Sequence, residues 1–134
     1  MRNYLITSHG YFAAKILYRL EIIAGKNKNI KTIEAYTDGN KSIDGQIDSV
    51  IEKLDSSDEL IIFTDLMGGS ITNQLLKYTL RKNTYIVSGV NLPLLLDITL
   101  AETDIPASEV IEAAIENARE QILFVNKLIP PSND

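Results

Sequence analysis

The chain contains a single histidine, His9, so any chemistry that needs an imidazole must use this residue. His9 follows the apolar residues 4–6 after Thr7 and Ser8, and it is followed by Gly10. A second polar segment, from Asp65 to Ser70, also follows an apolar run. An imidazole with an ordinary pKa of about 6.5 is mostly neutral near pH 7 and can then act as a nucleophile. A carboxylate such as that of Asp65 on one ring nitrogen would fix the tautomer and leave the other nitrogen to attack.

Both polar segments directly precede stretches that are predicted to be helices. A helix N-terminus offers unpaired N–H groups and the positive end of the helix dipole, which favour a phosphate dianion. Gly10, Gly68 and Gly69 would allow the backbone to approach that anion closely. Ser70 and the backbone N–H groups of its loop could hold the phosphoryl oxygens. Because phosphoryl transfer depends mainly on positioning and electrostatics, these residues suggest a histidine that receives a phosphoryl group.

Other interpretations of the same residues stay open at this point. Asp65 and Ser70 could be ordinary helix caps, and the two glycines a tight turn. A receiver domain phosphorylated on Asp65 would need an acidic pair after the first strand, where residues 7–10 have no carboxylate. A hydrolase built on Ser70, His9 and Asp65 would need a G-x-S-x-G turn, which residues 69–71 do not supply. A non-catalytic nucleotide- or flavin-binding module is a further alternative, although no G-x-G-x-x-G motif occurs.

Short apolar runs alternate with longer amphipathic stretches along the chain. The spacing predicts strands over residues 4–7, 30–36, 60–64 and 85–88. It predicts helices over residues 12–24, 43–54, 71–80 and 92–100, and a long helix from Ser108 toward Leu128. Strands that alternate with helices form βαβ units. We therefore expect an α/β fold, a three-layer, open, doubly wound sandwich around a mainly parallel sheet.

The order of the strands decides whether the two polar segments meet. We favour the order 2-1-3-4, similar to a flavodoxin-like core, for so small a domain. In that order the first and third strands are neighbours, about 4.8 Å apart, and the switch point of the sheet lies between them. His9 and Asp65 would then lie close together at the carboxyl ends of these strands, where open α/β sheets bind their ligands.

The composition limits the classes of protein in which these residues could act. The 134 residues fit one domain, and 45% hydrophobic and 23% charged residues are typical of a globular one. The absence of cysteine excludes disulfides, thiolate catalysis and cysteine-ligated zinc. The net charge of −5 argues against a partner made of nucleic acid. No apolar run reaches the roughly 20 residues of a membrane span, so we expect a cytoplasmic protein.

Three short segments carry motifs that can be compared with a known family. They are Ser8-His9-Gly10, residues 64–73 and residues 88–93. The first resembles the T/S-H-G motif of the mannose-type enzyme IIA of the bacterial phosphoenolpyruvate-dependent sugar phosphotransferase system. The second resembles that family's D-x-x-G-G-S-x-x-N signature, and the third its G-V-N-[LI]-P segment. The three motifs occur in the family's order, and the resemblance covers essentially the whole chain.

The resemblance implies a role for each candidate residue. His9 would accept a phosphoryl group from the phosphocarrier protein HPr and pass it to a histidine of enzyme IIB, which phosphorylates the sugar during uptake. Asp65 would orient His9, and Gly68, Gly69 and Ser70 would line the phosphoryl site. The resemblance implies no cofactor and no metal, and contact with the membrane only through the transporter. The sugar itself is not indicated by the sequence.

One rival family shares the fold and the histidine. The phosphotransferase subunit of dihydroxyacetone kinase is the nearest alternative, but its loop after the third strand usually lacks the D-x-x-G-G-S-x-x-N pattern. The run Gly68-Gly69-Ser70 therefore favours the sugar phosphotransferase system.

The resemblance also implies an assembly and domain limits. Family members are usually homodimers that exchange C-terminal segments, so part of Ile122 to Ile129 could be a swapped strand rather than the end of the last helix. We expect the IIA domain to cover residues 1–129 and residues 130–134 to form a polar tail. Enzyme IIB would be either a separate chain or a domain removed from a fusion.

Overall fold

The computed structural model describes residues 1–35, 43–65 and 70–131, and the side chains of residues 70–72 lie outside this description. The elements are β1 (Arg2–His9), α1 (Phe12–Ala24), β2 (Ile30–Ala35), α2 (Asp44–Glu52), β3 (Glu59–Thr64), α3 (Ser70–Leu75), the 3₁₀ helix η1 (Leu76–Leu80), β4 (Thr84–Ser88), α4 (Leu92–Leu100), α5 (Ala107–Glu120) and the 3₁₀ helix η2 (Val125–Leu128). The predicted alternation of strands and helices is confirmed.

The four strands form one parallel sheet in the order β2-β1-β3-β4. This is the 2-1-3-4 order expected from the sequence, and it makes β1 and β3 direct neighbours. Tyr4 pairs with Ile61 and Thr7 with Thr64, so the carboxyl ends of the two strands lie side by side. The switch point therefore lies at the end of β1, where His9 stands.

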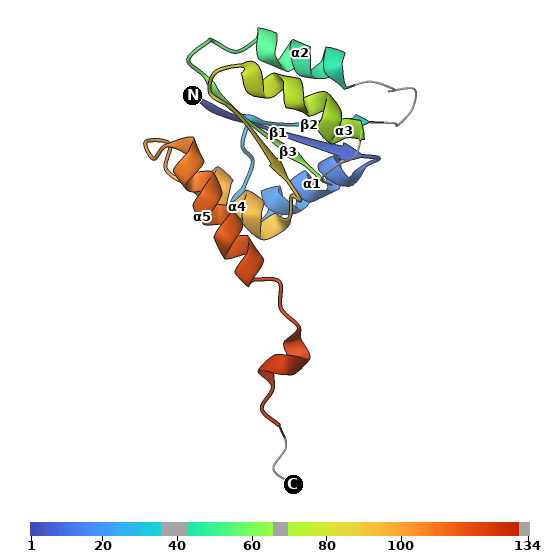
Figure 1. The fold of residues 1–134 in the computed structure, drawn as a ribbon, viewed down its shortest axis with the longest axis vertical. Coiled ribbons are helices and arrows are strands. Elements are labelled where there is room, and N and C mark those ends of the chain that lie inside the picture. Colours follow the sequence, from blue (N-terminus) through green and yellow to red (C-terminus); the bar gives the residue numbers. More distant parts are fainter. Residues whose placement is uncertain (36–42, 66–69, 132–134) are drawn as a thin grey trace.

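Helices cover both faces of the sheet, as expected for a doubly wound α/β sandwich (Figure 1). α1, α4 and α5 pack on one face, around Phe63, Leu95 and Ile98. α2, α3 and η1 pack on the other, around Ile47, Ile62 and neighbouring apolar side chains. The continuous apolar run of β3 is explained by this arrangement, because residues 60–64 are all buried and contact both layers.

The ends of two helices follow the local sequence signals. α1 ends at Ala24, and its C-cap residue Gly25 has φ +82°, a backbone conformation that favours glycine and stops the helix. α4 begins after Asn91, whose side chain accepts a hydrogen bond of 2.9 Å from the backbone N–H of Leu94. Pro93 lies in the first turn of α4, where the missing N–H costs no hydrogen bond.

The last helix is shorter than the sequence pattern predicts. The helix that we expected to run toward Leu128 ends at Glu120, and a 3₁₀ turn follows only at Val125–Leu128. Six apolar side chains beyond it are exposed by more than half: Ile122, Leu123, Phe124, Val125, Leu128 and Ile129. Without a surface on which to bury them, the helix gains no packing energy beyond Glu120. This segment points away from the body of the molecule (Figure 1).

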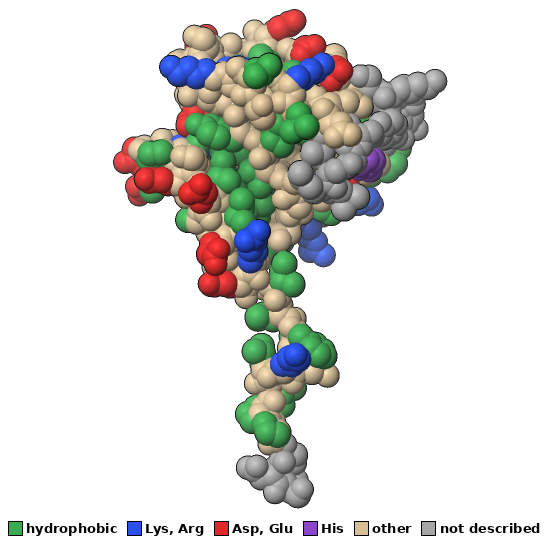
Figure 2. Space-filling model, in the orientation of Figure 1, with side chains coloured by type: hydrophobic (Ala, Val, Ile, Leu, Met, Phe, Trp, Pro, Cys, Tyr) green, Lys and Arg blue, Asp and Glu red, His purple; other side chains and the backbone are tan. Residues whose placement is uncertain are grey.

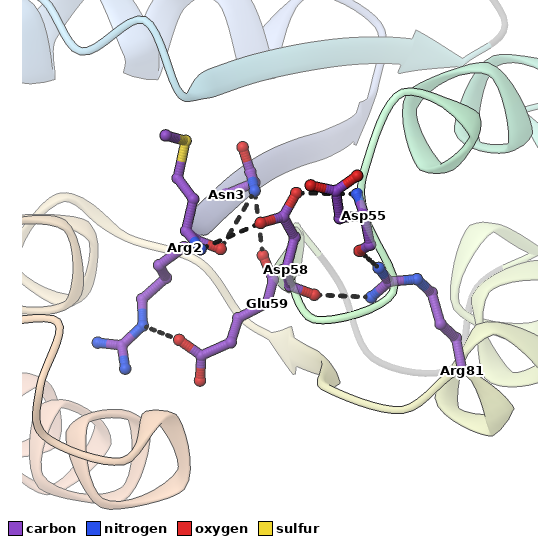
Figure 3. A network of polar contacts seen from close by, with 7 residues as sticks. Arg2, Asn3, Asp55, Asp58, Glu59 and Arg81 are labelled. Carbon is purple, nitrogen blue, oxygen red and sulfur yellow. Dashed lines mark hydrogen bonds and ion pairs between the residues drawn. The ribbon is translucent and has the colours of Figure 1, made fainter.

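The amino ends of the strands are held by a network of charges (Figure 3). The Arg2 side chain is 1% exposed, and its Nε donates to Glu59 Oε1 at 2.9 Å. Its Nη2 donates to the carbonyl of Ile105 at 2.6 Å, which ties β1 to the α4–α5 loop. Arg81 donates to the carbonyls of Asp55 and Asp58. At this edge of the sheet, direct hydrogen bonds therefore pair the guanidinium groups of Arg2 and Arg81 with groups of the protein itself.

Candidate active site

His9 and Asp65 meet at the carboxyl edge of the sheet, as the strand order predicts. His9 is the last residue of β1, and Asp65 directly follows the end of β3. Their side chains are 38% and 16% exposed, so the imidazole stands at the surface and the carboxylate lies beneath it. Fifty-six residues of sequence separate them, and only the parallel pairing of β1 with β3 brings them together.

Asp65 holds both the ring and the backbone of His9. Its Oδ2 lies 3.2 Å from Nδ1 of His9, and its Oδ1 lies 3.3 Å from the same nitrogen. Oδ2 also accepts a hydrogen bond of 3.0 Å from the His9 backbone N–H. A carboxylate can only accept, so Nδ1 must carry the ring proton in this contact. In the neutral imidazole the lone pair is then on Nε2.

The turn after His9 is fixed by Ser8, a role that the sequence analysis missed. Ser8 is fully buried, and its Oγ accepts a hydrogen bond of 2.8 Å from the backbone N–H of Ala13 in the first turn of α1. The same hydroxyl donates to the carbonyl of Gly10 at 3.3 Å. The N-cap residue, Tyr11, makes no side-chain cap hydrogen bond, so Ser8 caps α1 from the end of the strand. The signal that could have indicated this capping role is a serine at the end of a strand, five residues before an N–H group in the first turn of the next helix.

Gly10 occupies a backbone conformation that favours glycine. Its φ is +60°, and its N–H donates to the carbonyl of Ala35 at 3.1 Å. A larger residue would be strained there. The glycine thus allows the chain to turn sharply from β1 into α1 and leaves His9 at the outer rim of the sheet.

The structure brings together only part of the predicted site. His9, Gly10 and Asp65 lie at one edge, within the hydrogen-bond contacts given above. Gly68 and Gly69 lie outside the described residues, and Ser70 is described only as the first residue of α3, without its side chain. Their place around a phosphoryl group therefore remains a prediction.

Two buried hydroxyl groups at the same edge were not singled out from the sequence. Thr64 and Ser88 are register partners at the ends of β3 and β4. The side-chain oxygens of both are buried and have no hydrogen-bond partner in the described part of the chain. Unsatisfied hydroxyls of this kind are uncommon in protein interiors. Within the same described residues, no group of three or more His, Asp or Glu side chains is placed to hold a metal ion.

Comparisons with known proteins agree with this fold. The family described as "PTS system fructose IIA component" matches residues 3–115. The mannose-specific EIIAB component of the phosphotransferase system of Escherichia coli K12 is 27% identical over 121 residues, which cover 88% of this chain and 38% of that protein. The chain thus spans less than half of that relative's length.

Solved structures of similar proteins superpose over nearly the whole chain. One is a protein of Klebsiella pneumoniae assigned to a phosphoenolpyruvate-dependent sugar phosphotransferase permease, with a TM-score of 0.89, 32% identity, and coverage of 96% of this chain and 94% of that one. Another is the EIIA component of Streptococcus agalactiae, with a TM-score of 0.78, 29% identity, and coverage of 95% and 99%. These matches favour IIA components over dihydroxyacetone kinase subunits and nucleotide- or flavin-binding modules. The chain belongs to the fructose- and mannose-type IIA components of the sugar phosphotransferase system.

Proposed function

We propose that the chain is a phosphoryl carrier in which Nε2 of His9 accepts a phosphoryl group from phosphorylated HPr and passes it to enzyme IIB. The observation that carries this proposal is the contact of Asp65 with Nδ1 and with the backbone N–H of His9. That contact sets the tautomer and the direction of the imidazole before any partner arrives. The 38% exposure of His9 suits a group that must meet the histidine of another protein.

The transfer balances without a further reactant. The Nε2 lone pair of His9 attacks the phosphorus, a new N–P bond forms, and the N–P bond of the donor breaks with its electron pair going to the donor ring. The proton on Nδ1 of His9 stays in place, so positive charge develops on the ring, and the Asp65 carboxylate stabilises it. Gly68, Gly69 and Ser70 are proposed to hold the phosphoryl oxygens through backbone N–H groups and a hydroxyl. Gly10, whose own N–H donates to Ala35, is proposed to let the backbone approach the phosphoryl group closely. The same steps in reverse pass the group to enzyme IIB.

The deciding experiment measures the mass of the intact chain after incubation with enzyme I, HPr and phosphoenolpyruvate. We expect one added phosphoryl group that is lost after brief acid treatment, and none on a His9→Ala variant. The Gly10, Gly68, Gly69 and Ser70 assignments are tested by the rate of labelling in single alanine variants. An unlabelled wild-type chain, with HPr shown to be competent, would contradict the proposal.

We further propose that the chain works as a homodimer through its C-terminal segment, with the IIA domain over residues 1–129. The support is the row of exposed apolar side chains between Ile122 and Ile129, which needs a surface to cover it. A truncation after Gln121 is expected to convert a dimer into a monomer in light scattering, and an unchanged mass would contradict the proposal.

The described residues contain no helix long and apolar enough to span a membrane. We propose a cytoplasmic location, with the membrane reached only through the transporter.

A further inference from the structure

Two buried hydroxyl groups lie side by side at the carboxyl edge of the sheet. Thr64 is the last residue of β3 and Ser88 is the last residue of β4, and the two are register partners. Side chains alternate along a strand, so Thr64 faces the same layer as Ile62, and Ser88 faces the same layer as Ile86. Both isoleucines pack in the core formed with α2, α3 and η1. The side-chain oxygens of Thr64 and Ser88 are buried there, and no described residue forms a hydrogen bond with either of them.

The next hydroxyl in the same row across the sheet has a partner. Thr7 of β1 is the register partner of Thr64 on its other side, and its Oγ1 donates to the carbonyl of Phe63 at 2.8 Å. The backbone of Thr64 is also paired, since its carbonyl accepts from the N–H groups of Gly89 and Val90 at 3.0 and 3.1 Å. Backbone hydrogen bonds thus join the end of β3 to the turn after β4, whereas no described residue satisfies the two hydroxyl groups beside them.

The two side-chain oxygens are closed off from the solvent. Thr64 is 0% exposed, whereas His9 at the same edge is visible at the surface of the molecule, in purple (Figure 2). A ligand of the hydroxyl groups must therefore be small enough to be enclosed with them. It must also be neutral, because a pair of hydroxyls offers no charge to balance that of a buried ion. A water molecule meets both conditions.

The spacing of the strands matches a bridging water. Neighbouring strands lie about 4.8 Å apart, which is longer than a direct O–H···O hydrogen bond of about 2.8 Å. A water molecule that makes two hydrogen bonds of about 2.8 Å at a tetrahedral angle spans about 4.6 Å between its partners. Each hydroxyl can both donate and accept, so the pair can serve one water in either direction. Buried waters commonly join polar groups that are otherwise unsatisfied.

We propose that Thr64 and Ser88 bind one buried water molecule, which links the ends of β3 and β4 and thereby holds Asp65 against His9. Asp65 directly follows Thr64, and its carboxylate contacts both Nδ1 and the backbone N–H of His9. A shift at the end of β3 would therefore move the carboxylate relative to the imidazole. Thr64 and Ser88 are positioning residues in this proposal, because they act through Asp65. The water site follows from the two hydroxyls, and its effect on transfer rests on the proposed carrier function.

The first test locates the water and measures its contribution to stability. A crystal structure of the full chain that resolves ordered solvent should show one water within hydrogen-bond distance of Thr64 Oγ1 and Ser88 Oγ. Urea unfolding is then measured for Thr64→Val, Ser88→Ala and the double variant. Each single variant should lower the unfolding midpoint, because the remaining hydroxyl loses the bridge that satisfies it. The double variant should lower the midpoint by less than the sum of the two, since both substitutions remove the same water.

The second test follows the imidazole of His9. Because His9 is the only histidine of the chain, nitrogen NMR of isotope-labelled histidine reports this ring alone. We expect mainly the Nδ1–H tautomer in the wild type and a larger share of the Nε2–H tautomer in Thr64→Val, where Asp65 is held less firmly. With phospho-HPr as the donor, kcat should fall about tenfold in Thr64→Val, with KM within about twofold. Thr64→Ser, which keeps the hydroxyl, should retain most of the wild-type kcat.

Thr84 provides a matched control on the same strand as Ser88. It is the first residue of β4, at the amino edge of the sheet, and it is buried. Its Oγ1 accepts a hydrogen bond of 3.1 Å from Nη1 of Arg81. Thr84→Val thus repeats the loss of a buried hydroxyl at the opposite edge from His9. This variant should lower the unfolding midpoint and leave both the tautomer of His9 and kcat unchanged.

Four other outcomes would decide against parts of the proposal. Single variants that raise the unfolding midpoint, with additive effects, would show that the hydroxyls bind nothing and would overturn the water site. A crystal structure in which the two hydroxyls bond to each other, with no water between them, would overturn it as well. An unchanged tautomer and kcat in Thr64→Val, or an equal fall of kcat in Thr84→Val, would overturn the link to Asp65. A wild-type chain that holds the water but accepts no phosphoryl group from phospho-HPr would contradict the carrier function and leave the water site standing.

Discussion

The two edges of the sheet use charged residues in opposite ways. At the amino edge, Arg2 is buried, and its guanidinium donates to the Glu59 carboxylate at 2.9 Å (Figure 3) and to the carbonyl of Ile105 at 2.6 Å. At the carboxyl edge, His9 is 38% exposed and the buried hydroxyls of Thr64 and Ser88 have no hydrogen-bond partner in the described part of the chain. One edge pairs its charged side chains among the described residues, and the other holds a partly exposed imidazole and two hydroxyls that no described residue satisfies.

This difference indicates that the charged residues of the amino edge stabilise the fold, whereas those of the carboxyl edge are the ones proposed to act in phosphoryl transfer. Both edges belong to the same four strands, and at both a side chain of β1 contacts a carboxylate at the start of β3 or directly after its end. A parallel sheet directs all its carboxyl ends to one side, where strands lead into helix N-termini and the backbone N–H groups are unpaired. The opposite side lacks these groups. The following variants are chosen to test whether stability and transfer can be changed separately.

The largest effect is expected at the carboxyl edge, in Asp65→Asn. The amide keeps the shape of the carboxylate but removes the charge that we propose stabilises the positive ring of His9 during transfer. We expect the rate of phosphorylation by phospho-HPr to fall by roughly 100- to 1,000-fold, measured by rapid quench. The unfolding midpoint in urea should change little. Asp58→Asn at the amino edge is the matched control, and an equal loss of rate in that variant would show that the two edges do not differ.

The second effect is expected at the amino edge, in Arg2→Met. Methionine fills much of the volume but leaves Glu59 and the carbonyl of Ile105 without their donor. Removing one partner of a buried ion pair costs about 3 kcal/mol, which denaturant unfolding would detect. Arg2→Lys, which keeps the charge, should lose less. The transfer rate per folded molecule should equal that of the wild type, and a slower rate would mean that the amino edge also positions His9.

A smaller effect, on both the stability of the fold and the transfer rate, is expected in Ser8→Ala. The substitution removes the hydroxyl that caps α1 through Ala13 and holds the carbonyl of Gly10. Stability should fall by about 1 kcal/mol, and transfer should slow several-fold because the turn that carries His9 loosens. Ser8→Thr keeps the hydroxyl and should restore the rate. If Ser8→Thr is as slow as Ser8→Ala, the hydroxyl is not the group that matters.

The smallest effect is expected from the titration of Asp58. The backbone N–H of Asp55, and then the terminal ammonium at 3.0 Å, hold the pKa of this carboxyl below its usual range. A depressed pKa in the folded chain adds stability above the unfolded value of about 3.9, and this stability is lost as the pH falls toward the folded value. Asp58→Asn should therefore flatten the acid limb of stability against pH. An unchanged acid limb would show that these contacts contribute nothing.

Much of the architecture could be predicted because the local signals agree with one another. The apolar runs at residues 4–7 and 60–64 became β1 and β3, and Gly25 stopped α1. The helix predicted to run toward Leu128 was wrong because the local signals in the C-terminal segment do not agree with one another. Four consecutive apolar residues from Ile122 to Val125 do not define one helical face, and no layer formed by the described residues covers them. Helicity there would need tertiary packing that the single chain does not supply.

The sequence by itself determined which chemistry is possible: one imidazole, one carboxylate after an apolar run, and glycines where each strand turns into a helix. Only the tertiary structure decided that His9 and Asp65 touch, since a separation of 56 residues contains no distance information. It also decided that the buried Ser8 caps α1. The physical reason is that residue types follow from the chain alone, whereas neighbours at a sheet edge follow from strand order and register, which depend on the packing of all four strands at once.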